Sequence, residues 1–197
     1  MPTWTTHVEG GSWLSPGGTV TDCSKPQQDT IVNAYNDFIS DSCLDKFIGL
    51  KSCLESKWKV VEVDCTDPDC GSIDGRQSGD KILICDTWPW RVGSLLLHEM
   101  VHVCDGEELD SEAVEHACFV GRGATLPTSG DWDKFRSETS KLDSNILERV
   151  AKYVIWNSDT GEVWTKKTDS SGKVVKGNRI FQSDQWKHDY DSGGGWI

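Results

Sequence analysis

The sequence predicts an α+β domain in which helices pack on a small twisted mixed sheet, stapled by disulfides and followed by a β-rich segment. Three observations support this class. Apolar residues at helical spacing alternate along the chain with short β-branched runs. All eight cysteines lie between positions 23 and 118 of the 197 residues. Residues 157–197 carry the turn sequences Asp-Thr-Gly and Ser-Ser-Gly between short β-prone runs, which is typical of hairpins.

The first elements should be an irregular arm and a helical hairpin. Residues 1–26 are rich in Gly, Pro, Ser and Thr and show no sustained period. From Asp29 onward, apolar side chains fall at helical spacing in two groups separated by a break. The first group is Ile31, Ala34, Tyr35, Phe38 and Ile39, and the second is Leu44, Phe47, Ile48 and Leu54. Residues 58–63 then alternate in the manner of a strand.

The middle of the chain predicts a loop, a strand and a helix. Residues 65–80 contain Asp-Pro, Cys-Gly and Asp-Gly pairs, which favour a long turn-rich loop. We interpret its carboxylates as a solvated acidic surface, because their spacing does not match that of an EF-hand. Residues 81–85 predict a short apolar strand, and a helix should run from about Trp90 to Val103. The glycine at position 106 should end that helix.

Two more helices are expected after this break. One should begin at Asp110 or Ser111, which are good N-cap residues, and run to about Val120. The other should run from about Ser144 to Trp156, because its apolar residues fall on one side. We expect residues 1–156, including the arm, to form one domain. Residues 157–197 should form a β-rich segment with a flexible tail that belongs to the same domain.

Charge and cysteine content limit the partners and the compartment. The formal net charge of −12 and the pI near 4.7 would repel phosphate backbones and anionic lipid, so we expect neither nucleic acid nor membrane as a partner. The nearest cysteines, Cys65 and Cys70, are too far apart for a structural zinc pair, which favours disulfides. Disulfides imply a secreted protein in an extracellular or periplasmic setting. We expect a monomer whose partner is its peptide or protein substrate. The N-terminus shows no signal peptide, so any export signal would have been removed or replaced.

The motif His-Glu-Met-Val-His at positions 98–102 carries the chemistry. On a helix, residues four apart lie on one face, so the imidazoles of His98 and His102 can bind one ion. Zn²⁺ is the cofactor that this pair predicts. Glu99 lies at the edge of the same face, where it can act as the catalytic general base toward a zinc-bound water.

A catalytic zinc site needs a third protein ligand and an open position. The predicted helix after the motif offers several candidates. We favour Glu112 as the third ligand, with Glu115 as the alternative and with Asp110 and His116 still open. Because Glu112 and His116 are four residues apart, His116 could instead hydrogen-bond a ligand from the second shell.

The segment from about residue 81 to 120 resembles the zincin metallopeptidases, and more narrowly the gluzincins. In gluzincins a glutamate on a later helix completes the HExxH site, and Ser111-Glu112-Ala113 matches that segment, although His116 stands where aspartate is usual. The chain lacks the extended metzincin pattern, since Glu108 occupies the place of the third histidine. The resemblance also implies an edge strand above the metal that binds extended substrate, and residues 81–85 are our candidate. A Cys104–Cys118 bridge would then join the two ligand-bearing helices.

We therefore expect a hydrolase, namely a zinc-dependent endopeptidase that acts on peptides or proteins. Three alternatives remain. A zinc amidohydrolase acting on cell-wall or other amides would use the same residues. A secreted effector or toxin protease with one narrow target would use the same chemistry. A non-catalytic binding module with the same fold is disfavoured by the presence of Glu99. The sequence does not indicate the substrate or the disulfide pairing.

Overall fold

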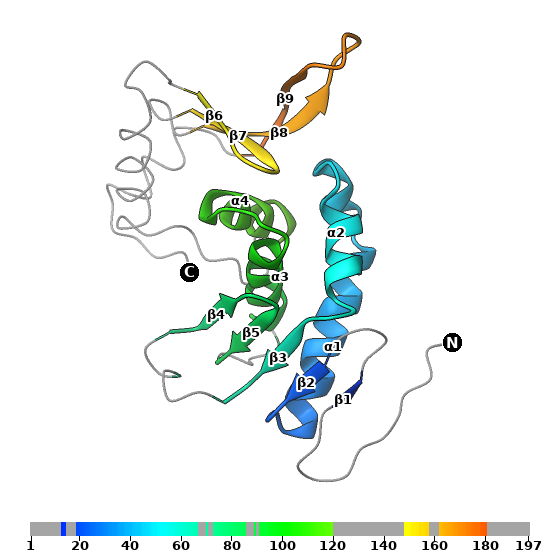
Figure 1. Ribbon diagram of the computed structural model, residues 1–197, viewed down its shortest axis with the longest axis vertical. Coiled ribbons are helices and arrows are strands. Elements are labelled where there is room, and N and C mark those ends of the chain that lie inside the picture. The colour runs from blue at the N-terminus through cyan, green and yellow to red at the C-terminus, as the bar shows by residue number, and fades with distance from the viewer. Residues whose placement is uncertain are drawn as a thin grey trace.

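The computed structural model describes residues 13–14, 19–66, 70, 73–85, 89, 91–119, 148–157 and 162–180. Within these residues the chain is α+β, with four α-helices, two small sheets and four disulfides (Figure 1). The helices are α1 (Lys25–Ser40), α2 (Leu50–Lys57), α3 (Val92–Val103) and α4 (Glu108–Phe119), with a 3-10 helix η1 (Ser42–Lys46) between α1 and α2. None of the described helices has both the length and the apolar character needed to cross a membrane.

The first sheet is mixed and lies under α3. Its strands are β1 (Trp13–Leu14), β2 (Thr19–Thr21), β3 (Glu62–Asp64), β4 (Gly75–Ser78) and β5 (Lys81–Ile84), and their order is β1-β2-β3-β5-β4. The three inner strands β2, β3 and β5 run parallel to one another, whereas β1 pairs antiparallel with β2 and β4 pairs antiparallel with β5 at the two edges. The helix α3 packs on β4 and β5 and against α1, α2 and α4 (Figure 1).

The predicted edge strand is wrong. Residues 81–85 were expected at the edge, but β5 lies inside the sheet between β3 and β4. The edge position belongs to β4, which comes from the segment predicted as a loop. A tight turn makes this possible, because Gly79 adopts a φ of 63° and lets Ser78 pair with Lys81. Residues 67–69 of the predicted loop lie outside the described residues.

The N-terminal pair of helices is confirmed in part, because the predicted second helix is split: Leu44 lies in η1, the chain turns at residues 47–49, and only Leu54 lies in α2. The helix α1 begins at Lys25, where the backbone N–H of Ser24 donates to the Gln27 side chain at 2.8 Å. Its buried face includes Tyr35, whose ring stacks on Trp58 with centroids 4.0 Å apart. Most of residues 58–63, predicted as a strand, instead complete the turn after α2, and only Glu62–Asp64 forms β3.

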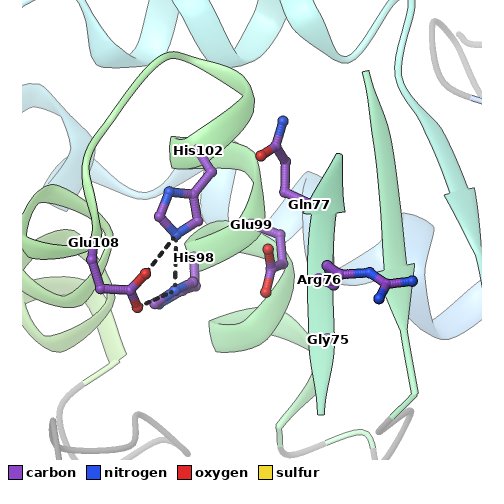
Figure 2. Close-up of a pocket in the computed structure, with 7 residues that line it drawn as sticks. All are labelled: Gly75, Arg76, Gln77, His98, Glu99, His102 and Glu108. Carbon is purple, nitrogen blue, oxygen red and sulfur yellow. Dashed lines mark hydrogen bonds and ion pairs between the residues drawn. The ribbon is translucent and has the colours of Figure 1, made fainter. Parts of the chain in front are cut away.

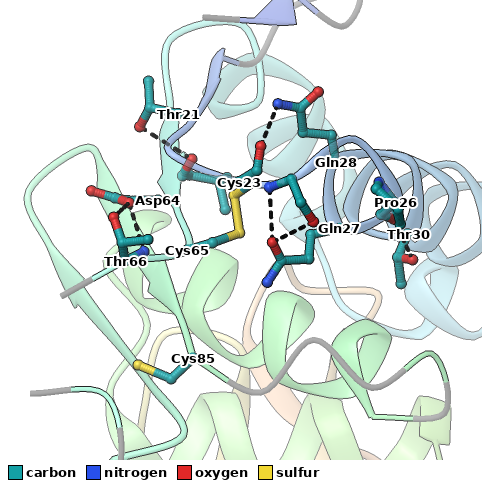
Figure 3. The surroundings of a disulfide bond; sticks show 12 residues. Thr21, Cys23, Pro26, Gln27, Gln28, Thr30, Asp64, Cys65, Thr66 and Cys85 are labelled. Carbon is teal, nitrogen blue, oxygen red and sulfur yellow. Dashed lines mark hydrogen bonds between the residues drawn. A yellow bond between two sulfur atoms is a disulfide. The ribbon is translucent and has the colours of Figure 1, made fainter. Parts of the chain in front are cut away.

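The cysteines form four disulfides, as predicted, but the expected Cys104–Cys118 bridge is wrong. The observed pairs are Cys23–Cys65, Cys43–Cys118, Cys53–Cys104 and Cys70–Cys85. Cys104 lies just before the turn into α4, whereas Cys118 lies near the far end of that helix, roughly 15 Å along its axis at about 1.5 Å per residue. The first bridge joins the ends of β2 and β3, and Gln28 of α1 donates to the Cys23 carbonyl beside it at 2.8 Å (Figure 3). Four disulfides indicate an oxidising environment.

The second sheet is an antiparallel meander, and it replaces a predicted helix. Its strands are β6 (Glu148–Val150), β7 (Val154–Asn157), β8 (Val163–Thr168) and β9 (Val174–Arg179), in that order. The helix predicted over 144–156 is therefore wrong from residue 148 onward, because β-branched and aromatic side chains of β7 are buried in sheet pairing. The β-rich prediction is confirmed for β8 and β9, and the predicted tail at 181–197 lies outside the described residues.

Candidate metal centre

The helix α3 places both motif histidines on one face. Its apolar side chains, including Leu96, Leu97 and Val101, are fully buried, so the helix has a fixed rotation in the core. The side chains of His98 and His102 remain 13% and 19% exposed. Their Nε2 atoms lie 3.3 Å apart, as the spacing of four residues predicts (Figure 2).

A tight turn after α3 brings a carboxylate to these two nitrogens. Asp105 adopts a φ of 55°, and the Gly106 N–H donates to the Val101 carbonyl at 2.9 Å. Only glycine fits at position 106, because a Cβ there would come within 2.5 Å of a Val101 methyl carbon. The chain then enters α4 two residues earlier than predicted, with Glu108 as its first residue.

Glu108 contacts both histidines. Its Oε1 lies 3.2 Å from His98 Nε2, and its Oε2 lies 3.3 Å from His102 Nε2 (Figure 2). In a tetrahedral site with metal bonds of about 2.0–2.2 Å, the ligand atoms are about 3.3–3.6 Å apart. The separation of the two Nε2 atoms is close to such an edge, and each of them lies within 3.3 Å of a different oxygen of the Glu108 carboxylate. Two imidazoles and a carboxylate are also a donor set that suits first-row transition metals, so this group could bind a metal.

The outer nitrogens of both rings have acceptors that fix their tautomer. His102 Nδ1 lies 3.0 Å from the Gly106 carbonyl oxygen, and because that oxygen can only accept, Nδ1 carries the proton. His98 Nδ1 lies 3.1 Å from the buried Glu115 carboxylate. When neutral, both rings can therefore direct an unprotonated Nε2 at an ion, and the hydrogen bonds hold each ring in place.

The electrostatics of the group favour added positive charge. Hydrogen bonds from His102 and His98 hold the pKa of Glu108 well below its usual range. Burial lowers the pKa of His98, but hydrogen bonds with Glu108 and Glu115 outweigh it, and the pKa lies well above its ordinary value. The carboxylates thus favour a proton on His98. A divalent cation bound between them would supply the same positive charge.

Glu99 lies beside this group and under the edge strand. Its side chain is only 6% exposed, and burial raises its pKa. A Cβ at Gly75 would meet Glu99 Oε1 at 3.2 Å, so β4 passes close above the carboxylate. An open cavity of about 410 Å³ lies here (Figure 2). Its lining residues are Gly75, Arg76, Gln77, His98, Glu99, His102 and Glu108.

The other predicted site residues lie elsewhere on α4. Glu112 and Glu115 are buried and gather with His98 in a second donor group that does not include His102. Glu115 contacts the His98 ring, the kind of contact that we predicted for His116. Burial lowers the pKa of His116 to about 4. The roles of Glu112 as a ligand and of His116 in the second shell stay predictions. The Asp110 carboxylate accepts hydrogen bonds from the backbone N–H groups of Glu107 and Tyr153.

Sequence reasoning passed over Glu108 as a ligand, although its spacing contained the signal. Glu108 follows His102 by six residues, the place of the third histidine in the extended metzincin pattern. Asp105 stands where that pattern has glycine, and it adopts a positive φ, a conformation that glycine adopts more readily than aspartate.

No protein family, no curated protein and no solved structure matches this chain. Its function is therefore inferred from the geometry around α3 and α4.

Proposed function

We propose that this chain is a zinc-dependent endopeptidase, with zinc held by His98, His102 and Glu108. The observation that carries the proposal is the meeting of three donor groups at 3.2–3.3 Å in a cavity that Glu99 also lines. When bound, the zinc ion would polarise a substrate carbonyl and lower the pKa of a coordinated water molecule. The remaining chemistry falls to residues of the chain.

Glu99 is suited to act as the general base. It is adjacent to His98 on α3, so its carboxylate faces the cavity without joining the donor group. Burial raises its pKa, which makes it a better proton acceptor than an exposed glutamate. Glu99 would take a proton from the attacking water and deliver it to the leaving amine, so no proton is lost in the cycle.

The strand β4 suits an extended polypeptide substrate. Among the described strands it pairs on one side only, with β5, and three of its residues line the cavity. An edge strand offers free N–H and C=O groups with which a peptide can pair as an added strand. This feature favours a polypeptide over a small amide as the substrate. Carboxylates in the cavity and a net charge of −12 favour neutral or basic sequences.

The arrangement is consistent with the zincin resemblance of the sequence. The resemblance implies an edge strand near the metal, and the edge strand β4 packs beside the HExxH helix α3. A glutamate from the following helix completes the donor group, as in gluzincins, although the turn resembles the metzincin spacing. Four disulfides support the further proposal that the enzyme is secreted.

The test is the substitution Glu99→Gln. It should leave zinc binding unchanged within about twofold and lower peptide hydrolysis by about 10²- to 10⁴-fold, because only the proton acceptor is lost. Glu55→Gln, at an exposed position of α2, is the matched control and should retain full activity. Zinc is measured by chelator competition, and hydrolysis is measured on unfolded proteins and on small amides in parallel. Undiminished cleavage by the Glu99 variant would refute the mechanism, and cleavage of small amides alone would favour an amidohydrolase.

A further inference from the structure

The turn that carries Glu108 is held by the second sheet. The hydroxyl of Tyr153, in the turn between β6 and β7, donates to the Cys104 carbonyl oxygen at 3.0 Å. Lys152 Nζ lies 3.0 Å from the exposed Asp105 carboxylate. The second sheet therefore contacts the chain between the two helices of the donor group, and in Figure 1 β7 lies next to α4.

Asp110 is the centre of this contact. Its side chain is fully buried, and its two oxygens accept hydrogen bonds from four backbone N–H groups. Three donors come from the turn and start of β7, at 3.1 Å for Lys152, 2.7 Å for Tyr153 and 3.1 Å for Val154. The fourth donor is the N–H of Glu107, at 3.0 Å. The Asp110 carboxylate thus joins the first turn of α4 to residues 152–154, which lie 42 to 44 positions later in the sequence.

These contacts fix the position of Glu108 along the chain. A buried carboxylate is tolerated because hydrogen bonds replace its lost hydration, so the four bonds act as one unit. Glu107 and Asp110 flank Glu108, and both are held at the second sheet. Rotation of the first turn of α4 would move the Glu108 carboxylate away from the two Nε2 atoms.

We propose that Asp110 is a positioning residue for the metal centre, through which the second sheet sets the place of Glu108. This proposal rests on the metal site of the proposed function. It predicts that metal affinity depends on a contact outside the cavity. It also predicts that this dependence passes through Glu108 and not through the two histidines.

The first experiment compares two Asp-to-Asn substitutions on the same connection. Asp110→Asn replaces one acceptor oxygen by an NH₂ group that faces N–H donors, so one pair of bonds is lost whichever way the amide lies. Zn²⁺ affinity, measured by chelator competition, should fall about 10- to 100-fold, as for other partners of metal ligands. The absorption spectrum of the Co²⁺-loaded protein should change as well. Asp105→Asn keeps an acceptor oxygen and only weakens the exposed ion pair with Lys152, so it should change zinc affinity by less than about twofold and leave the Co²⁺ spectrum unchanged.

A double-mutant cycle tests whether Asp110 acts through Glu108. In a Glu108→Gln background, adding Asp110→Asn should weaken zinc binding by less than about twofold, because the positioned group is already gone. If the two losses multiply, Asp110 stabilises the fold without positioning Glu108 and the proposal fails. If Asp110→Asn does not fold, Tyr153→Phe replaces it. That variant removes one bond to the turn and should weaken zinc binding about two- to tenfold, again only when Glu108 is present.

The two proposals fail in different ways. A wild-type chain that binds neither Zn²⁺ nor Co²⁺ overturns the metal site and, with it, the role of Asp110. A wild-type chain that binds zinc, with a folded Asp110→Asn variant that binds equally well, overturns the role of Asp110 alone.

Discussion

Replacing Glu108 by glutamine removes the carboxylate that lies 3.2 Å from His98 Nε2 and 3.3 Å from His102 Nε2. Structural zinc sites with four ligands bind with about 10–16 kcal/mol, or about 2.5–4 kcal/mol for each ligand. Loss of one of the three protein ligands should therefore weaken zinc binding roughly 10²- to 10³-fold at about 1.4 kcal/mol per tenfold. The matched variant is Glu112→Gln, which removes a carboxylate that gathers with His98 but not with His102. It should weaken zinc binding by no more than about 10- to 100-fold, the range for a residue that supports a metal ligand, and by less than Glu108→Gln does.

The assay is competition for zinc against a chelator of known affinity, with both variants and the wild type at the same pH. Circular dichroism of each metal-free variant checks that the fold is intact, so that a loss of affinity reports on the site. The result that would refute the reasoning is a larger loss for Glu112→Gln than for Glu108→Gln. That result would return the third position to Glu112, where the sequence first placed it.

Two further predictions concern the base and the buried tyrosines. Gly75→Ala should lower kcat about tenfold without changing zinc affinity, because the new Cβ would meet a backbone oxygen at 3.0 Å and displace Glu99, whose Oε1 it would meet at 3.2 Å. Ser78→Ala on the same strand is the control. A Gly75→Ala variant with the kcat of the wild type would contradict this prediction. Burial raises the pKa of Tyr35 and of Tyr153 from 10 to about 12. The fold therefore favours the protonated form of each tyrosine, by about 2–3 kcal/mol at most. This stabilisation is complete below pH 10 and is lost as the pH rises through 12. Urea midpoints between pH 9 and 12 should fall less in the Tyr35→Phe variant, and native tyrosines that ionise near pH 10 would contradict the pKa shifts.

The parts of the site that depend on local sequence could be predicted. The positions of His98, Glu99 and His102 on one helix follow from a spacing of four residues and from the apolar residues around them. The disulfide state of the cysteines followed from their number and spacing. The pairing could not be predicted, because Cys53 and Cys104 meet only once α2 has packed against α3.

The third donor and the edge strand depend on backbone turns that the sequence does not display. Glu108 reaches the histidines only because Asp105 adopts a positive φ, a conformation that glycine was expected to supply. The strand β4 is visible only through its pairing with β5 across Gly79. The helix expected over 144–156 failed for a related reason. Val150 and Val154 have helical spacing, but long-range pairing with β8 and burial favour the strand at Val154.

The disulfides offset a cost that the negative charge of the site imposes on the fold. Glu99, Glu112 and Glu115 are 3–7% exposed around one pair of histidines, and Glu108 joins them from the first turn of α4. So many carboxylates in one buried region repel each other and cost desolvation, which destabilises the metal-free fold. The bridges Cys53–Cys104 and Cys43–Cys118 close loops of 51 and 75 residues, and the chain-entropy model gives about 4 kcal/mol of stabilisation for each. They attach the end of α3 and the end of α4 to the N-terminal helices, while Asp110 attaches the turn between them to the second sheet. The helices that carry the donors are thus held from outside the cavity, so their geometry does not depend on the ion that the carboxylates would bind.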